Sequence, residues 1–244
     1  MSPPRLIVDF DGVVCDALVE CALVTWLGAH PPAPDVPVSS YAIAMPDGFV
    51  RRFAKVRDYA RTLHHFLVAH RAAADRLTTQ AQFDALYGVI PAATVRSFVA
   101  AATAARQRCR VEETAYWLDL HALYPGVEDL LLRHAGAVAV ITAKDADSVW
   151  TILRRRGLDH TVGEVIGECS RKDEAVAELC ARTGTTPQQT VFIDDNLTNV
   201  RRVARTGART YWATWGYHTP EDVAAAAGAR VRPLTLAGLP TLNV

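Results

Sequence analysis

Short apolar runs alternate with amphipathic segments along much of this 244-residue chain, and this alternation limits its fold more than any other feature. Five runs are apolar nearly throughout, as in strands covered on both faces: residues 5–10, 137–143, 164–168, 190–195 and 209–216. The segments 144–157, 170–184 and 197–207 have helical apolar spacing and end in glycine, which commonly stops a helix. Strand, helix and strand in succession predict an α/β fold with a doubly wound, Rossmann-like parallel sheet.

The stretch between the first two runs is too long for a single crossover. After an opening helix and a proline-rich connection, helical patterns continue to about His121. One helix face is predicted by apolar residues that recur three or four positions apart: Phe49, Phe53, Val56, Ala60, Leu63 and Leu67. We therefore predict a catalytic core of residues 1–16 and 122–244, with an all-helical cap inserted over residues 17–121.

Composition excludes several classes of partner. The formal net charge is +0, which gives no overall attraction to nucleic acid or to an anionic membrane. Residues 48–110 nevertheless carry eleven Arg or Lys against three acids. These arginines either solvate helix faces or attract an anionic substrate. No stretch approaches the roughly 20 apolar residues of a membrane span.

The cysteines indicate the compartment. There are five, an odd number, and they show neither CxxC nor Cys/His metal spacing. The apolar run at residues 5–10 also leaves no room for a signal peptide before it. We expect a cytoplasmic protein, a monomer or homodimer, with no nucleic-acid or membrane partner.

Polar side chains lie at the carboxyl ends of three of the predicted strands. Asp9 and Asp11 lie at the end of the first, Thr142 at the end of the second, and Asp194 with Asp195 at the end of the fourth. Because the carboxyl ends of parallel strands share one edge, these groups converge on one crevice. Four acids there repel one another unless a cation neutralises them, and carboxylate oxygens favour Mg²⁺. The alternative is an Asp-Gly turn and a helix cap.

Lys172 lies in the segment "SRKDEAV", which has the pattern of a helix start with Ser170 as N-cap and Asp173 three residues later. A lysine in the first turn opposes the helix dipole, which indicates an anion such as phosphate nearby. Thr142, followed by the amides of Ala143 and Lys144, would add a phosphate cradle. The simpler alternatives are an exposed lysine and a strand-end hydroxyl.

These segments resemble, in order and setting, the four motifs of the haloacid dehalogenase (HAD) superfamily: "IVDFDGV", "VAVITA", "SRKDEAV" and "VFIDDNLTNV". The resemblance spans residues 5–216 apart from the helical insertion, which lies where the family has its C1 cap. The chain departs from the usual pattern in having Ala143 after the motif II threonine and Asn199 where a second acid is common.

The resemblance implies a Mg²⁺-dependent phosphatase that acts on a small phosphorylated metabolite. Asp9 would attack phosphorus and form an aspartyl-phosphate, and Asp11 would be the general acid and base. Mg²⁺ would be held by Asp9, the Asp11 carbonyl and Asp195, with Asp194 helping directly or through water. Thr142, Ala143 and Lys172 would hold the transferring oxygens.

Other interpretations stay open at this point. Within the superfamily these are a phosphomutase or a phosphonate hydrolase, although the latter would usually need a cap lysine and Lys55 is the only one. A dehalogenase is disfavoured because Asp11 is present. From another class, a receiver-like signalling module or a non-catalytic phospho-ligand-binding protein would also carry such acids. In the cap, the candidates for contact with substrate are His64, His65, Arg57 and Arg61.

Overall fold

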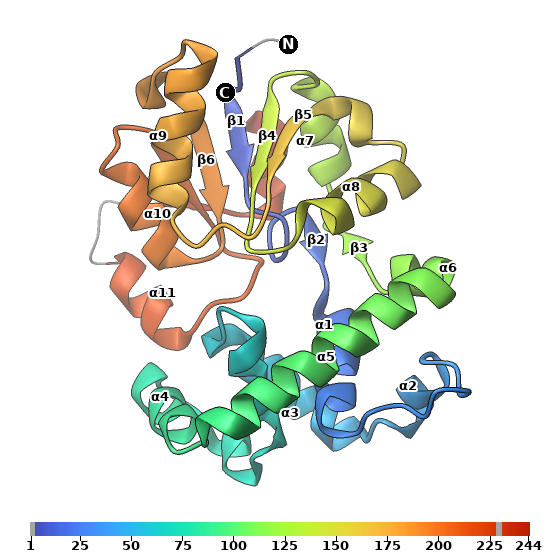
Figure 1. Ribbon diagram of the computed structural model, residues 1–244. Helices are drawn as coiled ribbons and strands as arrows, with labels where there is room; N and C mark the ends of the chain where they lie inside the picture. Colours follow the sequence, from blue (N-terminus) through green and yellow to red (C-terminus); the bar gives the residue numbers. More distant parts are fainter. Residues whose placement is uncertain (1–2, 228–230) are drawn as a thin grey trace. The chain divides into compact units, whose positions relative to one another are not determined.

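The computed structural model describes residues 3–227 and 231–244 and divides them into two compact units (Figure 1). The first comprises the described residues of Met1–Asp16, Ala122–His218 and Asp222–Val244. The second comprises Ala17–His121 and Thr219–Glu221.

The first unit is built on a parallel sheet. Within the described residues six strands pair in the order β5-β4-β1-β6-β7-β8. Their bounds are β1 Leu6–Val8, β4 Val138–Ile141, β5 Val162–Ile166, β6 Val191–Asp194, β7 Arg209–Ala213 and β8 Arg232–Leu234. The predicted doubly wound α/β fold is confirmed, although the strands are shorter than the apolar runs. Strand β8 was not predicted, because a short edge strand with exposed Arg232 and Pro233 has no apolar signature.

Helices lie on both sides of this sheet (Figure 1). Those outside residues 17–121 are α7 Val127–Arg133, α8 Ala146–Arg155, α9 Lys172–Thr183, α10 Leu197–Ala204 and α11 Pro220–Ala227, with short 3-10 turns at Asp159–Thr161, Pro187–Gln189 and Leu236–Thr241. On one face, Ile7 and Phe192 pack with α9 residues such as Val176. Leu6 and Val8, which point to the other face, are also fully buried. Burial along the central strands β1, β4 and β6 explains why their runs are apolar throughout.

A second, two-stranded sheet lies where the chain leaves and re-enters the first unit. Strand β2 (Cys15–Asp16) pairs antiparallel with β3 (Ala122–Leu123), and Asp16 is directly opposite Ala122. Because each strand has so few residues, neither shows an alternating apolar pattern in the sequence. The ends of the long insertion are therefore hydrogen-bonded neighbours.

The second unit is helical and has its own core. Its elements are α1 Leu18–Ala29, α2 Ser40–Ala44, α3 Asp47–Tyr59, η1 Leu63–His70, η2 Ala72–Arg76, α4 Gln80–Gly88, α5 Ala92–Glu112 and α6 Thr114–Asp119. Phe53, Val56, Phe83 and Ala102 are among the residues that form one buried cluster. The unit therefore has an apolar interior independent of the sheet.

The single helix predicted over residues 49–67 was wrong. Helix α3 ends at Tyr59, and a 3-10 segment starts at Leu63 after an extended Thr62. The Arg57 guanidinium donates to the Ala60 carbonyl at 3.2 Å, and the Arg61 guanidinium donates to a carbonyl of α3. These side chains satisfy carbonyls that would accept backbone hydrogen bonds if the helix continued. The apolar spacing therefore extends past the residue where the helix ends.

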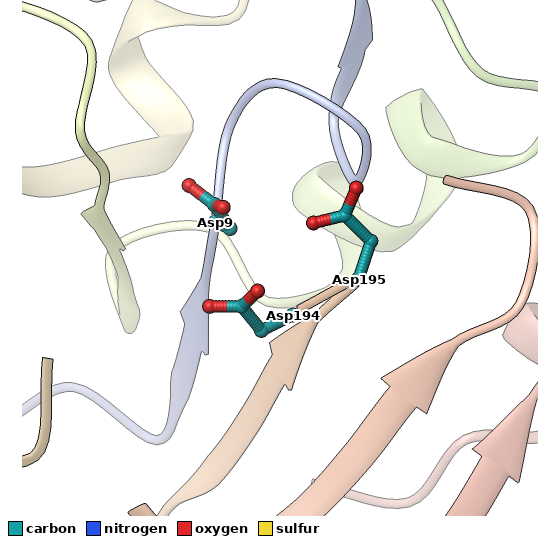
Figure 2. Close-up of side chains that lie close together, drawn as sticks. All are labelled: Asp9, Asp194 and Asp195. Atoms are coloured by element: carbon teal, nitrogen blue, oxygen red, sulfur yellow. The ribbon is translucent and has the colours of Figure 1, made fainter. Parts of the chain in front are cut away.

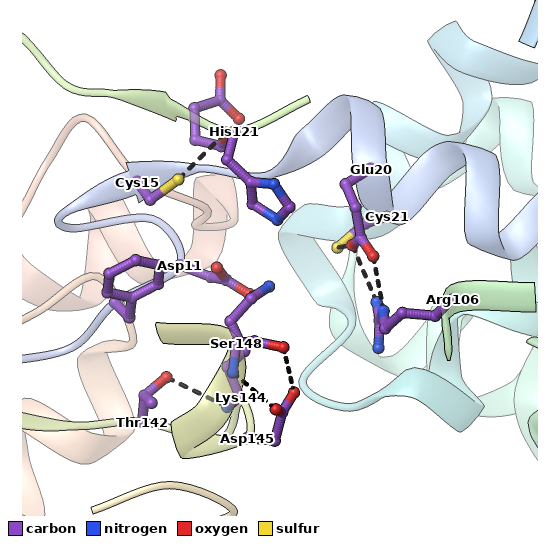
Figure 3. Close-up of polar contacts among 12 residues, drawn as sticks. Asp11, Cys15, Glu20, Cys21, Arg106, His121, Thr142, Lys144, Asp145 and Ser148 are labelled. Atoms are coloured by element: carbon purple, nitrogen blue, oxygen red, sulfur yellow. Dashed lines mark hydrogen bonds and ion pairs between the residues drawn. The ribbon is translucent and has the colours of Figure 1, made fainter. Parts of the chain in front are cut away.

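A buried carboxylate lies in the second unit. Glu20 is 1% exposed, and its two oxygens accept hydrogen bonds of 2.6 and 3.0 Å from the guanidinium of Arg106 (Figure 3). The indole of Trp117 donates a third, at 3.4 Å. A bidentate, charge-assisted pair of this kind ties α1 to α5 and offsets the cost of burying the charge.

No single helix in residues 3–227 and 231–244 is long and apolar enough to cross a membrane. Helices α4 and α5 pass such a test only when taken together, and they bend by 100° at the break between them.

Candidate active site

Three carboxylates meet at the carboxyl ends of β1 and β6. Asp9 follows β1, Asp194 ends β6, and Asp195 is the next residue (Figure 2). One oxygen from each lies within 4.8 Å of the others, and all three side chains are buried. The two strands are direct neighbours, and the Asp9 amide donates to the Ile193 carbonyl at 2.9 Å. Adjacent parallel strands thus bring together acids that are far apart in sequence.

Lys172 supplies a cation between two of these acids. Its Nζ lies 2.6 Å from Asp9 Oδ2 and 2.8 Å from Asp194 Oδ2, and its side chain is 4% exposed. Burial alone lowers the pKa of Lys172, but the charges of Asp194 and Asp9 outweigh it and raise this pKa. Burial, together with the charge of Asp9, raises the pKa of Asp194 to about 6 against the attraction of Lys172. One ammonium is therefore shared by two carboxylates and neutralises only one of them.

The predicted cap of the Lys172 helix is wrong in detail. Helix α9 begins at Lys172 itself, and the N-cap is Arg171, with no side-chain cap hydrogen bond, rather than Ser170. The loop before α9 makes backbone hydrogen bonds to the loop that follows β4. The Glu168 amide donates to the Lys144 carbonyl at 3.0 Å and the Cys169 amide to the Thr142 carbonyl at 2.9 Å. These tertiary bonds, which the local pattern does not contain, set where the helix starts.

Thr142 and Ala143 lie at the end of β4, where the sequence placed them. Thr142 is 2% exposed, and its Oγ1 accepts a 3.2 Å hydrogen bond from the Lys144 amide (Figure 3). Helix α8 begins only at Ala146, with Asp145 as its N-cap. The amides of Ala143 and Lys144 therefore precede the helix instead of opening it, and the Lys144 amide is bound to Thr142.

Asp11 lies in the turn after β1, and the side chain of Lys144 contacts it. Lys144 Nζ is 3.2 Å from Asp11 Oδ2, and the two side chains are 7% and 18% exposed (Figure 3). Asp11 Oδ1 is buried and has no hydrogen-bond partner among the described residues. Sequence reasoning used only the backbone amide of Lys144. The sequence did carry one signal for the Lys144 side chain, which is that lysine is rare in this chain. It has only three lysines, Lys55, Lys144 and Lys172.

Two glycines and a backbone amide fix the position of Asp195. Its Oδ2 accepts a 2.7 Å hydrogen bond from the Tyr217 amide. Gly12 has φ +90°, and a Cβ there would overlap Asp195 Oδ2. A Cβ on Gly216 would lie 2.7 Å from the same oxygen and would overlap the Gly12 carbonyl. The sequence indicated Gly12 as a turn residue only, and it gave no signal for Gly216 or Tyr217.

Comparison with known proteins supplies the family. The model of the haloacid dehalogenase-like hydrolases matches residues 5–202, which is most of the chain. The chain belongs to this family. A region of 108 residues is 29% identical to the phosphoglycolate phosphatase of Pasteurella multocida and 30% identical to that of Haemophilus influenzae, covering 41% of this chain and 48% of each relative. The chain thus spans about half the length of the curated relatives it matches.

Solved structures support the fold of this HAD-like hydrolase over its whole length. A predicted phosphoglycolate phosphatase from Haemophilus somnus aligns with a TM-score of 0.61 at 19% identity, covering 99% of this chain and 98% of the other. One from Lactobacillus delbrueckii, described as putative, aligns with a TM-score of 0.64 at 16% identity, covering 98% and 97%. At these identities the likeness concerns the fold alone.

The donor set of the HAD-like site suits a divalent cation. Asp9, Asp194 and Asp195 offer only carboxylate oxygens, the ligands that hard cations prefer. Asp194 accepts hydrogen bonds from the Asn196 amide at 2.7 Å and from Lys172 and Asn199 at 2.8 and 3.1 Å. Asn199, the departure from the family pattern, therefore acts as a hydrogen-bond donor to Asp194.

A cysteine near Asp11 and a histidine of the second unit have structural contacts. Cys15 is fully buried, and this burial raises the pKa of its thiol, which disfavours a nucleophilic thiolate. In the second unit, the ring of His65 packs edge-on against Phe83 and Tyr87 and accepts from the Arg61 amide at 3.2 Å. Burial, with the positive neighbours of the ring, lowers the pKa of His65 to about 4. His65 is therefore neutral near pH 7, half-buried and packed against aromatic side chains of that unit.

Proposed function

We propose that this protein is a divalent-metal-dependent phosphatase that hydrolyses a small phosphorylated metabolite through an aspartyl-phosphate on Asp9. The observation that carries the proposal is the grouping of Asp9, Asp194 and Asp195 around one edge of the sheet, with Lys172 bridging two of them. Membership of a hydrolase family, and relatives named phosphoglycolate phosphatase, support phosphoryl-ester hydrolysis. The active-site roles below follow the motif resemblance.

In the first step, a carboxylate oxygen of Asp9 attacks phosphorus while the bond from phosphorus to the ester oxygen breaks. Asp11 gives its proton to that ester oxygen, so the product leaves as an alcohol. Thr142, the Ala143 amide and Lys172 hold the transferring oxygens. A water then attacks phosphorus, Asp11 takes its proton, and the bond to Asp9 breaks to release phosphate.

Mg²⁺ is the proposed metal. The Asp9 carboxylate, the Asp11 carbonyl and Asp195 would hold it, with Asp194 direct or through water. When bound, the cation screens the charge that otherwise repels an anionic nucleophile from a phosphoryl group. Lys172 supplies one positive charge to the same acids and orients Asp9 through the 2.6 Å contact.

The inserted unit is proposed to be the cap that excludes water and selects the substrate. Within the family, a phosphomutase would use the same residues of the core. A phosphonate hydrolase would need a cap lysine, and Lys55 already donates to the Asp75 carbonyl at 2.8 Å. A cytoplasmic location is part of the proposal and is supported by five cysteines that are all free thiols.

The test is steady-state release of phosphate from a panel of phosphorylated metabolites with Mg²⁺. Asp9→Asn should lower kcat by roughly 10³-fold or more, because the nucleophile is lost while the shape of the site is kept. Asp147→Asn, which changes an exposed acid on α8, is the matched control and should keep full activity. A fully active Asp9→Asn enzyme would refute the proposed mechanism. Wild-type protein that binds phosphorylated ligands without releasing phosphate would favour the non-catalytic alternative.

A further inference from the structure

Tyr217 makes two hydrogen bonds that lead to different parts of the first unit. Its amide donates to Asp195 Oδ2 at 2.7 Å, and its hydroxyl donates to Asp16 Oδ1 at 2.9 Å. Asp195 follows β6 (Figure 2), whereas Asp16 ends β2 and is the last residue of the first unit before the helical unit begins. One residue therefore connects a proposed metal ligand to the strand at which the insertion starts. The proposed function gives the side chain of this residue no role.

The ring of Tyr217 is held between these two hydrogen bonds. The residue is 8% exposed. A Cβ on Gly12 would lie 3.0 Å from Tyr217 Cδ2, so the ring packs directly on the turn after β1. Burial and the nearby charge of Asp16 raise the pKa of Tyr124, and a hydrogen bond with Tyr217 opposes this rise. Packing along the ring and polar contacts at its end thus restrict how far the side chain, and the amide attached to it, can move.

The strand that carries Asp16 is itself fixed by other contacts. Strand β2 pairs antiparallel with β3, so that Asp16 is directly opposite Ala122. Trp215, two residues before Tyr217, donates from its indole to the Val13 carbonyl at 3.2 Å. Asp16 therefore lies on a segment that is held in place independently of the Tyr217 hydroxyl, and a hydrogen bond to it restrains that hydroxyl.

We infer that Tyr217 is a positioning residue for the divalent cation: the hydrogen bond from its hydroxyl to Asp16 holds in place the amide that orients Asp195. This inference rests on the proposed function, in which Asp195 is a metal ligand. Any residue other than proline could supply the amide, so the hydroxyl is what distinguishes tyrosine at this position. A carboxylate that is held in its binding position before the cation arrives loses less freedom on binding, which raises the affinity.

The experiment measures Mg²⁺ binding by isothermal titration calorimetry, without any turnover. Tyr217→Phe removes the hydroxyl and keeps the ring and the amide. It should raise the Kd for Mg²⁺ by about 10-fold, the lower end of the range for outer-shell partners, because the amide itself remains. Tyr211→Phe is the matched control, since Tyr211 lies on β7 with its ring centroid 6.0 Å from the Arg232 guanidinium carbon, and it should keep the wild-type Kd. A wild-type Kd in Tyr217→Phe would overturn the inference.

Substitutions of Asp16 test whether the hydroxyl acts through this carboxylate. In an Asp16→Ala background, Tyr217→Phe should change the Kd by less than about 2-fold, because the hydrogen bond is already absent. If the full effect of Tyr217→Phe persisted there, the hydroxyl would act through another contact and the inference would be wrong. Asp16→Asn loses the charge but keeps an acceptor oxygen, so it should weaken Mg²⁺ binding less than Asp16→Ala does. Equal weakening by the two substitutions would also count against the hydrogen bond.

Thermal unfolding separates positioning from a purely structural role. A structural hydrogen bond would lower the Tm of Tyr217→Phe in EDTA and leave the rise in Tm on adding Mg²⁺ as large as in wild type. The inference predicts a smaller rise at the same Mg²⁺ concentration, because stabilisation by a bound ligand depends on its Kd. An equal rise would contradict it. Wild-type protein that binds no Mg²⁺ would refute the proposed metal dependence as well, whereas Mg²⁺ binding that does not respond to Tyr217→Phe refutes this inference alone.

Discussion

Gly216→Ala tests whether close packing around Asp195 is what holds this carboxylate ready for a metal. A methyl group at residue 216 would overlap the Gly12 carbonyl and lie 2.7 Å from Asp195 Oδ2. The backbone of Gly216 does not have a left-handed φ, so the effect of the substitution is steric. Either Asp195 or the turn at Gly12 must move.

The magnitude follows from the contacts that such a move disrupts. Overpacking a filled site costs about 1–3 kcal/mol, which corresponds to a fall in Tm of roughly 2–12 °C for a chain of this size. The 2.7 Å bond from the Tyr217 amide to Asp195 Oδ2 is also lost or weakened. Loss of a partner that orients a metal ligand typically weakens metal affinity by about 10- to 100-fold. Gly12→Ala should be worse, because it adds the strain of φ +90° to the overlap.

The assay is a Mg²⁺ titration of intrinsic fluorescence, with Tm measured in parallel. Trp212 is a natural reporter, since its indole donates to the Asp195 carbonyl at 2.8 Å. Gly48→Ala is the control, because a Cβ there meets nothing within 4 Å and alanine favours the helix. A Gly216→Ala protein with the wild-type Kd for Mg²⁺ would show that Asp195 does not depend on this packing.

Two further predictions concern buried charge. Lys172→Met leaves Asp9 and Asp194 without their shared cation, so it should destabilise the metal-free protein by about 3–5 kcal/mol, and Mg²⁺ should restore part of the loss. Thermal unfolding with EDTA and with Mg²⁺ measures this, and a wild-type Tm in EDTA would contradict it. His65 has a folded pKa of about 4, below the usual histidine value of 6.5, so its contribution to stability is complete above pH 6.5 and is lost as pH falls toward 4. His65→Asn should therefore flatten the fall in the urea midpoint over that range, and an unchanged slope would rule out this residue as its source.

The sheet and the acids at its edge were predictable because their signals are local. An apolar run identifies a buried strand, and a residue at its end is placed at the carboxyl edge by parallel topology alone. This argument alone places Asp9 and Asp194 together. The HAD resemblance added the order of the motifs, and the family model confirms that membership.

The contacts that orient those acids were not predictable, because the residues in contact are not related by the spacing of any helix or strand. Tyr217 reaches Asp195 through a backbone amide, which any residue type but proline could provide. Lys144 reaches Asp11 across two loops whose separation in sequence carries no spacing signal. The break after α3 was missed for a related reason, since side chains rather than helical bonds satisfy the carbonyls there.

The short pairing of β2 with β3 has a consequence for how such a chain varies. Asp16 and Ala122 are opposite one another, so the two ends of the intervening segment are about 5 Å apart. A segment that starts and ends at one point can change its length with little effect on the sheet, since each doubling of a flexible loop costs only about 0.6 kcal/mol. A two-residue turn would span the same gap. The acidic residues thus stay on the parallel sheet, and insertions of very different lengths can begin and end at the hydrogen-bonded β2–β3 pair.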